Sequence, residues 1–124
     1  MLKRLLDSVI LIDHFNNILE ATQFILSLDP EETAISVITR AEILVGFQGP
    51  ELEVVKALLD QYEFLSIDKT IADMAAELRR DHGRKLPDAF QAAIATYHHL
   101  KFCTRNTKDF DTSKHPFVEI PYQI

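Results

Sequence analysis

The chain has 124 residues, of which 47% are hydrophobic and 26% are charged, with only 3 Gly. These proportions are typical of a packed globular protein and exclude a disordered or low-complexity chain. The formal net charge of -6 argues against a protein that holds nucleic acid on a broad basic surface, because such binding depends on Lys and Arg neutralising phosphates. Any nucleic-acid activity must therefore be local. From the length we expect a single domain over residues 1–124.

Cys103 is the only cysteine, so the chain can form neither an internal disulfide nor a cysteine-based zinc site. A single free thiol fits a reducing cytoplasm. The apolar run at 9–12 ends at Asp13, and the longest uncharged stretch, 89–100, falls well short of the roughly 20 apolar residues of a membrane helix. We therefore expect a cytoplasmic protein with neither a signal peptide nor a membrane span.

Hydrophobic periodicity predicts strands and helices in alternation along the chain. The expected strands are a short one ending at Asp7 and others over 33–37, 64–67, 101–104 and 117–120; the expected helices start at Ser8 and cover 19–28, 39–47, 52–62, 70–80 and 87–99. Strands separated by helices imply a parallel sheet with helices on both faces. We therefore predict an α/β fold, a three-layer α/β/α sandwich with a central parallel sheet.

Acidic and amide residues follow the predicted strands. In open parallel sheets the ligand site lies beyond the carboxyl ends of the strands. Asp7 ends the first strand, Glu42 lies in the first turns of the helix after the second, Asp88 opens the long helix, and Asn106 and Asp109 follow the strand around Cys103. Four segments that are distant in the sequence are thus expected to converge.

Each of these residues also has a structural explanation. Asp7 and Asn106 suit N-cap positions, 39–42 matches a capping box, and Asp88 suits a helix N-terminus and its dipole. For any one of them alone, capping is the favoured explanation. Their joint placement changes the balance, because several carboxylates at one edge repel one another unless a proton or a cation neutralises them.

A divalent cation is the natural neutraliser of such a cluster. With oxygen donors only, Mg²⁺ or Mn²⁺ is favoured over zinc. In paired sites these ions stabilise the attacking and leaving oxygens of a phosphodiester displacement, and a metal-bound water removes the need for a separate general base. The residues therefore predict metal-dependent hydrolysis of a phosphodiester.

The same residues carry a resemblance to the PIN-domain family, and within it to the VapC-like toxins. Four segments resemble the motifs of that family and occur in its order: 5–13 (LLDSVILID), 35–46 (ISVITRAEILVG), 86–89 (LPDA) continuing into 92–95 (AAIA), and 104–110 (TRNTKDF). Each string alone is weak, but their joint order and spacing is specific. The resemblance covers essentially the whole chain.

The resemblance implies a Mg²⁺-dependent endoribonuclease, with Mn²⁺ as a substitute. Carried over by position, Asp7, Glu42 and Asp88 would be catalytic carboxylates that bind the metal. Ser8 and Thr104 would orient waters or phosphate.

At the fourth acidic position this chain departs from many family members, because it has Asn106 where they have Asp. Either Asn106 contacts the metal through water, or Asp109 supplies the charge, and both alternatives stay open. The resemblance further implies an RNA substrate cut in a single-stranded or loop region. It also implies a homodimer and an antitoxin whose tail blocks the acidic site.

Basic residues near the acidic ones are candidates for phosphate contacts, because phosphate binding favours Arg or Lys close to the metal. These candidates are Arg40, Arg79, Arg80, Arg84 and Lys85. Solvated charge at helix ends is the alternative for all of them. Asp13 is expected on the surface or behind the metal-binding residues.

Other functions fit the sequence less well. A phosphatase that forms an aspartyl-phosphate needs a second Asp two residues after the first, and Val9 stands there. The chain also has no Gly-rich phosphate loop with Lys. Two alternatives stay open: a PIN-like RNA- or protein-binding module that has lost its metal, and a housekeeping PIN nuclease without an antitoxin.

Overall fold

The computed structural model describes residues 1–124. A five-stranded parallel sheet forms the middle layer of the protein. The strands pair in the order β3-β2-β1-β4-β5, and every pairing is parallel. Their bounds are β1 (Arg4–Leu6), β2 (Thr33–Ser36), β3 (Glu63–Leu65), β4 (Lys101–Cys103) and β5 (Val118–Glu119). This order places β1 at the centre of the sheet.

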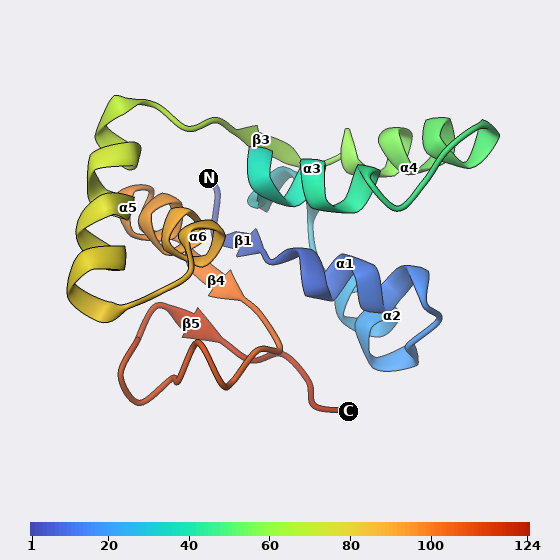
Figure 1. The fold of residues 1–124 in the computed structure, drawn as a ribbon. Coiled ribbons are helices and arrows are strands. Elements are labelled where there is room, and N and C mark those ends of the chain that lie inside the picture. The colour runs from blue at the N-terminus through green and yellow to red at the C-terminus, as the bar shows by residue number, and fades with distance from the viewer.

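Helices cover both faces of the sheet (Figure 1). The helices are α1 (Ser8–Phe15), α2 (Leu19–Leu26), the short 3₁₀ turn η1 (Pro30–Glu32), α3 (Val37–Leu44), α4 (Pro50–Leu59), α5 (Lys69–His82) and α6 (Leu86–Tyr97). None of them combines the length and the hydropathy needed to cross a bilayer. The predicted three-layer α/β/α sandwich is therefore confirmed.

Neighbouring residues of each strand enter different cores, because successive side chains of a strand point to opposite faces. Leu5 packs in one hydrophobic cluster and Leu6 in the other. The first cluster contains α5 and α6 through residues such as Ile71, Ala75 and Ile94, and the second contains α1 to α4 through Ile10, Ile25, Ile43 and Leu59. Two cores thus fix the sheet from both sides.

The expected elements are all present, with shifted ends. The largest consequence concerns α3, which begins at Val37 because the Ser36 hydroxyl accepts a hydrogen bond from the Thr39 backbone N–H at 3.1 Å. Ser36, not Thr39, is therefore the N-cap, and Glu42 lies in the second turn of the helix. The capping-box interpretation of 39–42 is wrong, which leaves the Glu42 carboxylate free for another role.

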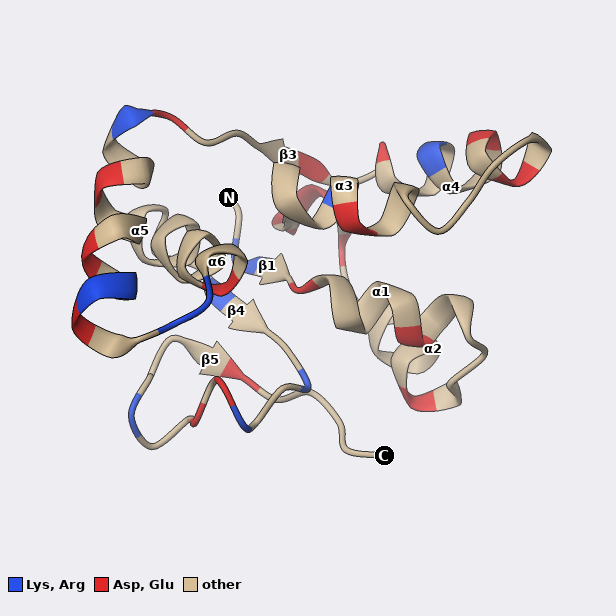
Figure 2. Ribbon diagram, viewed as in Figure 1, with Lys and Arg blue, Asp and Glu red and all other residues tan.

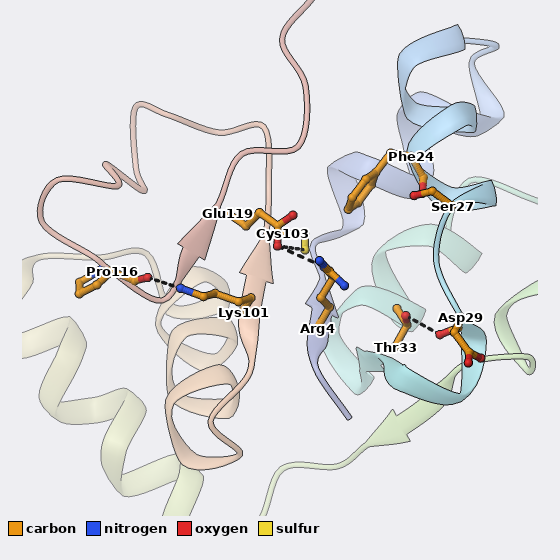
Figure 3. A network of polar contacts seen from close by, with 9 residues as sticks. All are labelled: Arg4, Phe24, Ser27, Asp29, Thr33, Lys101, Cys103, Pro116 and Glu119. Atoms are coloured by element: carbon orange, nitrogen blue, oxygen red, sulfur yellow. Dashed lines mark hydrogen bonds and ion pairs between the residues drawn. The ribbon is translucent and has the colours of Figure 1, made fainter. Parts of the chain in front are cut away.

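Side chains hold the edge strand β5 to the sheet (Figure 3). Arg4 of β1 reaches past β4 and donates from Nε to Glu119 Oε1 at 3.1 Å, and Lys101 donates from Nζ to the Pro116 carbonyl at 2.9 Å. The Cys103 thiol contacts the same Glu119 oxygen at 3.8 Å. Burial, followed by the charge of Glu119, raises the pKa of the Cys103 thiol, so it stays protonated and can donate.

A buried chain of hydrogen bonds joins β1, α3 and α6. The Gln91 amide donates from Nε2 to Thr39 Oγ1 at 2.7 Å, and the Thr39 hydroxyl donates to the Leu6 carbonyl at 3.3 Å. Thr39 is fully buried and Gln91 is 2% exposed, so water cannot replace these bonds. The chain therefore fixes the distance between three elements at the carboxyl end of β1.

Replacing Thr39 tests this chain. Thr39→Val leaves the buried Gln91 amide and Leu6 carbonyl unpaired, so we expect the free energy of unfolding to fall by about 1–3 kcal/mol, measured by urea denaturation. Adding Gln91→Leu should recover part of the loss, because replacing both partners of a buried hydrogen bond with apolar groups costs less than orphaning one. Simple additivity of the two substitutions would contradict a direct coupling.

Candidate active site

Acidic side chains gather around one cavity at the carboxyl ends of β1 and β4. The cavity has a volume of about 400 Å³, and only one of its eleven lining residues is hydrophobic. In Figure 2, acidic positions follow the end of β1 and lie on α3 and at the start of α6. The lining includes Asp7, Ser8, Glu42, Asp88, Asn106 and Lys108. The three carboxylates predicted to converge do share this cavity.

Asp7 follows β1 directly, at the N-cap position of α1. Its side chain makes no cap hydrogen bond, so the capping explanation does not account for it. Instead the buried Thr104 hydroxyl donates to Asp7 Oδ2 at 2.7 Å. This contact turns the carboxylate away from the helix and toward the cavity, and it links the ends of β1 and β4.

Glu42 and Asp88 approach the cavity from two helices. The Ser8 hydroxyl donates to Glu42 Oε1 at 3.1 Å, which ties α3 to the first turn of α1. Asp88 lies in the first turn of α6, where the helix dipole favours its negative charge. Each carboxylate also lies close in sequence to the buried chain of hydrogen bonds. Asp7 is next to Leu6, Glu42 lies one helical turn after Thr39, and Asp88 lies one helical turn before Gln91. Packing below the cavity therefore sets the spacing of the charges above it.

Burial and like charge make ionisation of this cluster unfavourable. Burial raises the pKa of Asp7 to about 6; the charges of Asp88 and Glu42 add to this, while hydrogen bonds from Thr104 and the Ser8 backbone oppose it. The pKa of Asp88 is raised as well, first by burial and then by the charge of Asp109. A bound cation would relieve both effects.

The donor set fits a hard divalent cation. All candidate ligands supply oxygen, which suits Mg²⁺ or Mn²⁺. No three His, Cys, Asp or Glu side chains lie together as a group that could hold a metal ion by themselves. The carboxylates would therefore share the ion with water, as Mg²⁺ usually requires in proteins.

Asn106 and Asp109 belong to one turn but face different cavities. Asn106 Oδ1 accepts from the Asp109 backbone N–H at 3.2 Å, and Asn106 Nδ2 donates to Asp109 Oδ2 at 2.8 Å. Asn106 lines the acidic cavity, whereas Asp109 lines the neighbouring one. No helix follows Asn106, so the N-cap explanation is wrong and its side chain stabilises a turn instead.

The predicted substrate-binding residues are distributed unevenly. Ser8 and Thr104 direct their hydroxyls to Glu42 and Asp7, and so position carboxylates. Arg40 lies away from the acidic cavity and donates a hydrogen bond to Asp60 at 2.8 Å. Its predicted role in substrate binding therefore has no support from its position. Lys85 lines the neighbouring cavity together with Arg84.

Arg79 and Arg80 also lie outside the acidic cavity. Arg79 donates from Nη1 to the Arg84 carbonyl at 3.0 Å, and Arg80 pairs with Asp81 at 3.2 Å. Both therefore act within or next to the end of α5. Arg84 itself is 9% exposed, because it packs over the Phe110 ring.

Asp13 is buried, so of its two predicted positions the one on the surface is wrong. Arg105 clamps its carboxylate with two hydrogen bonds, from Nε at 2.7 Å and from Nη2 at 3.0 Å, and Tyr122 donates a third at 2.8 Å. These contacts lower the pKa of Asp13 against the opposing effect of burial. They attach the loop after β4 and the C-terminal segment to α1.

Sequence reasoning missed Gln91, Arg105 and Lys108 as lining residues of the acidic cavity. Gln91 had a usable signal, since it lies one helical turn after Asp88 on the same face. Arg105 and Lys108 lie in a loop, where periodicity gives no indication of direction.

The raised pKa of Asp7 predicts a pH-dependent stability. Without a divalent cation, folded Asp7 (pKa about 6) holds its proton more tightly than the unfolded chain (pKa 3.8). Its contribution is therefore complete below the unfolded value and lost as the pH rises through the folded one, by at most about 3 kcal/mol. Asp7→Asn should remove this loss in urea denaturation series in EDTA, and Mg²⁺ should stabilise the wild type more than the variant. An unchanged pH profile in Asp7→Asn would contradict the burial of an ionisable Asp7.

Comparison with known proteins identifies the family. A family model described as PIN domain matches residues 4–114. Ribonuclease VapC10 of Mycobacterium tuberculosis is 32% identical over 123 residues, which cover 92% of each chain. A chain in the toxin-antitoxin complex from Klebsiella pneumoniae has a TM-score of 0.89 and 36% identity, covering 98% of this chain and 100% of that one. For the DNA-bound VapBC from Salmonella typhimurium the TM-score is 0.75 and the identity 26%, with coverage of 99% and 98%. With matches over nearly its whole length, the chain belongs to the PIN-domain family.

Proposed function

We propose that this protein is a Mg²⁺-dependent endoribonuclease, for which Mn²⁺ can substitute, and that it is the toxin of a toxin–antitoxin pair. The observation that carries the hydrolytic part is the convergence of Asp7, Glu42 and Asp88 on one polar cavity. The raised pKa values of Asp7 and Asp88 favour a cation at that position. The similarity to a protein named ribonuclease supports RNA as the substrate.

In the proposed reaction, Asp7, Glu42 and Asp88 would hold the metal together with water. When bound, the ion supplies Lewis-acid stabilisation of the phosphate and lowers the pKa of a bound water. Thr104 and Ser8 keep Asp7 and Glu42 in place through their hydroxyls. Asn106, which carries no charge and lines the cavity, would contact the metal only through water. Asp109 faces the neighbouring cavity and holds Asn106 in its turn.

Partner proteins are proposed from the relatives and from the surface. Two of the similar structures are titled as a toxin–antitoxin complex and as VapBC, which supports a cognate antitoxin for this chain. Large apolar side chains are exposed on and next to α2, α3 and α4: Leu19 at 62%, Leu26 at 78%, Val45 at 87% and Val54 at 70%. Such residues favour a protein–protein interface, and we propose a homodimer.

Substitution of the carboxylates tests the catalytic proposal. Asp7→Asn and Asp88→Asn should each reduce Mg²⁺-dependent RNA cleavage by at least about a hundredfold, because each removes a charge at the reacting phosphate. The change keeps side-chain size, and circular dichroism should show a folded chain. Asp60→Asn, an identical change at the remote Arg40 pair, is the matched control and should cleave normally. Full wild-type activity in excess EDTA would reject the metal mechanism.

Expression in growing bacteria separates a toxin from a housekeeping nuclease. We expect growth arrest with the wild-type chain and normal growth with Asp88→Asn. Co-expression of the short reading frame next to the gene should relieve the arrest. A wild-type chain that cleaves RNA in vitro without slowing growth would favour the housekeeping alternative.

A further inference from the structure

A second cavity adjoins the acidic one. It has a volume of about 610 Å³ and no hydrophobic residue in its lining. Asp88, Thr107 and Lys108 line both cavities, so the two are continuous along one side of the sheet edge. Basic positions in the link between α5 and α6 and in the loop between β4 and β5 are visible below α6 in Figure 2. The second cavity therefore places cations next to the proposed metal site.

Cations without a carboxylate partner concentrate in this cavity. The chain has 13 Lys and Arg, and six of them form salt bridges: Lys3, Arg4, Arg40, Lys56, Arg80 and Arg105. Of the seven that remain, four line the second cavity: Arg84, Lys85, Lys108 and Lys114. The lining also contains Asp88, Asp109 and Asp111, so its formal charge is +1 in a chain of net charge -6. Unpaired cations around a polar cavity favour an anion within it.

Arg84 is the buried member of this group. Its Nη1 donates to the Asp109 carbonyl at 3.0 Å and its Nη2 contacts the His115 ring, while its buried Nε has no hydrogen-bond partner. Burial and the charge of Arg84 lower the pKa of His115. None of these partners is an anion. Burial of Arg84, which is only 9% exposed, lowers the pKa of its guanidinium, and the charges of Asp88 and Asp109 offset this only in part.

Two acids of this cavity are held by neutral hydrogen-bond donors and form no salt bridge with its cations. Asp109 Oδ2 accepts from the Asn106 amide at 2.8 Å, and Asp111 Oδ1 accepts from the Ser113 backbone and hydroxyl at 2.9 and 2.8 Å. Asp88, which lines both cavities, is a proposed metal ligand. Its charge would be neutralised on the active-site side. With a metal bound to Asp88, the remaining positive charge of the second cavity would favour an anion beside the metal site.

We propose that the second cavity is a subsite for a backbone phosphate of the RNA strand that flanks the phosphate being cleaved. This inference rests on the proposed function. Lys85 and Lys114 would contact the flanking phosphate, Lys108 would lie between the two phosphates, and Arg84 would supply fixed positive potential from below. A flanking phosphate provides binding energy without taking part in the reaction, so the subsite acts on KM and on the register of cleavage.

Kinetics of charge-neutralised variants test the subsite. Lys85→Gln/Lys114→Gln should raise KM about tenfold for an RNA that the wild type cleaves, with a much smaller effect on kcat. The slope of log kcat/KM against log salt concentration should also become shallower by about 1 to 2, roughly one for each lost phosphate contact. Lys69→Gln, the same change at an exposed, unpaired lysine at the start of α5, is the matched control and should leave all three quantities unchanged.

Single methylphosphonate substitutions identify the phosphate. In fluorescence anisotropy with Mg²⁺, with Asp7→Asn as the common background to prevent cleavage, neutralising one linkage should weaken binding of the RNA when both lysines are present. The same neutral linkage should cause no further loss of RNA affinity in the double lysine variant, because the lysine charges that contact this phosphate are already removed. Additive losses at every linkage would overturn the proposal.

Two further outcomes separate the inference from the proposed function. If the wild type cleaves RNA but the double lysine variant keeps its KM and weakens only the antitoxin complex, the cavity serves the protein partner and the subsite is rejected. If the wild type cleaves no RNA, the proposed function fails, whereas the anisotropy experiment still decides whether the cavity holds an RNA phosphate.

Discussion

The carboxylates of Asp7, Glu42 and Asp88 are held at one edge of the sheet although their charges repel one another. Buried contacts beneath the cavity hold the three carboxylates together against this repulsion. Thr39 and Gln91 join β1, α3 and α6, and Thr104 holds Asp7 directly. Because the surrounding cores fix these elements from both faces of the sheet, the carboxylates cannot separate without loss of packing. In the proposed function, a bound cation would relieve this repulsion.

The distribution of charge explains how an acidic chain can act on a polyanion. A broad basic surface is unnecessary when the reacting phosphate meets a cation bound by the protein. The unpaired lysines are placed beside that position, around the second cavity. The two cavities share Asp88 and Lys108, and we propose that the first serves the chemistry and the second binds the strand.

The loop after β4 carries residues of both cavities and needs its own supports. Arg105 is clamped to the buried Asp13, which also accepts a hydrogen bond from Tyr122 near the C-terminus. Arg84 packs over Phe110 and bonds to the carbonyl of Asp109 from the other side. A loop fixed at both ends to α1 and to the end of α5 can present Asn106 and Lys108 at constant positions, which binding and catalysis require.

The sequence by itself determined the alternation of strands and helices, the parallel sheet and the identity of the converging carboxylates. Hydrophobic period and turn residues are local signals, and in a parallel sheet the residue after each strand must lie at the same edge. Only the tertiary structure decided which neighbours those residues have. Arg40 was a candidate from its position beside Glu42, but α3 turns it toward Asp60; Asp13 looked peripheral, yet Arg105 and Tyr122 meet it from remote segments. Side-chain direction on short helices and the path of a long loop depend on contacts between distant parts of the chain, and no local pattern encodes those contacts.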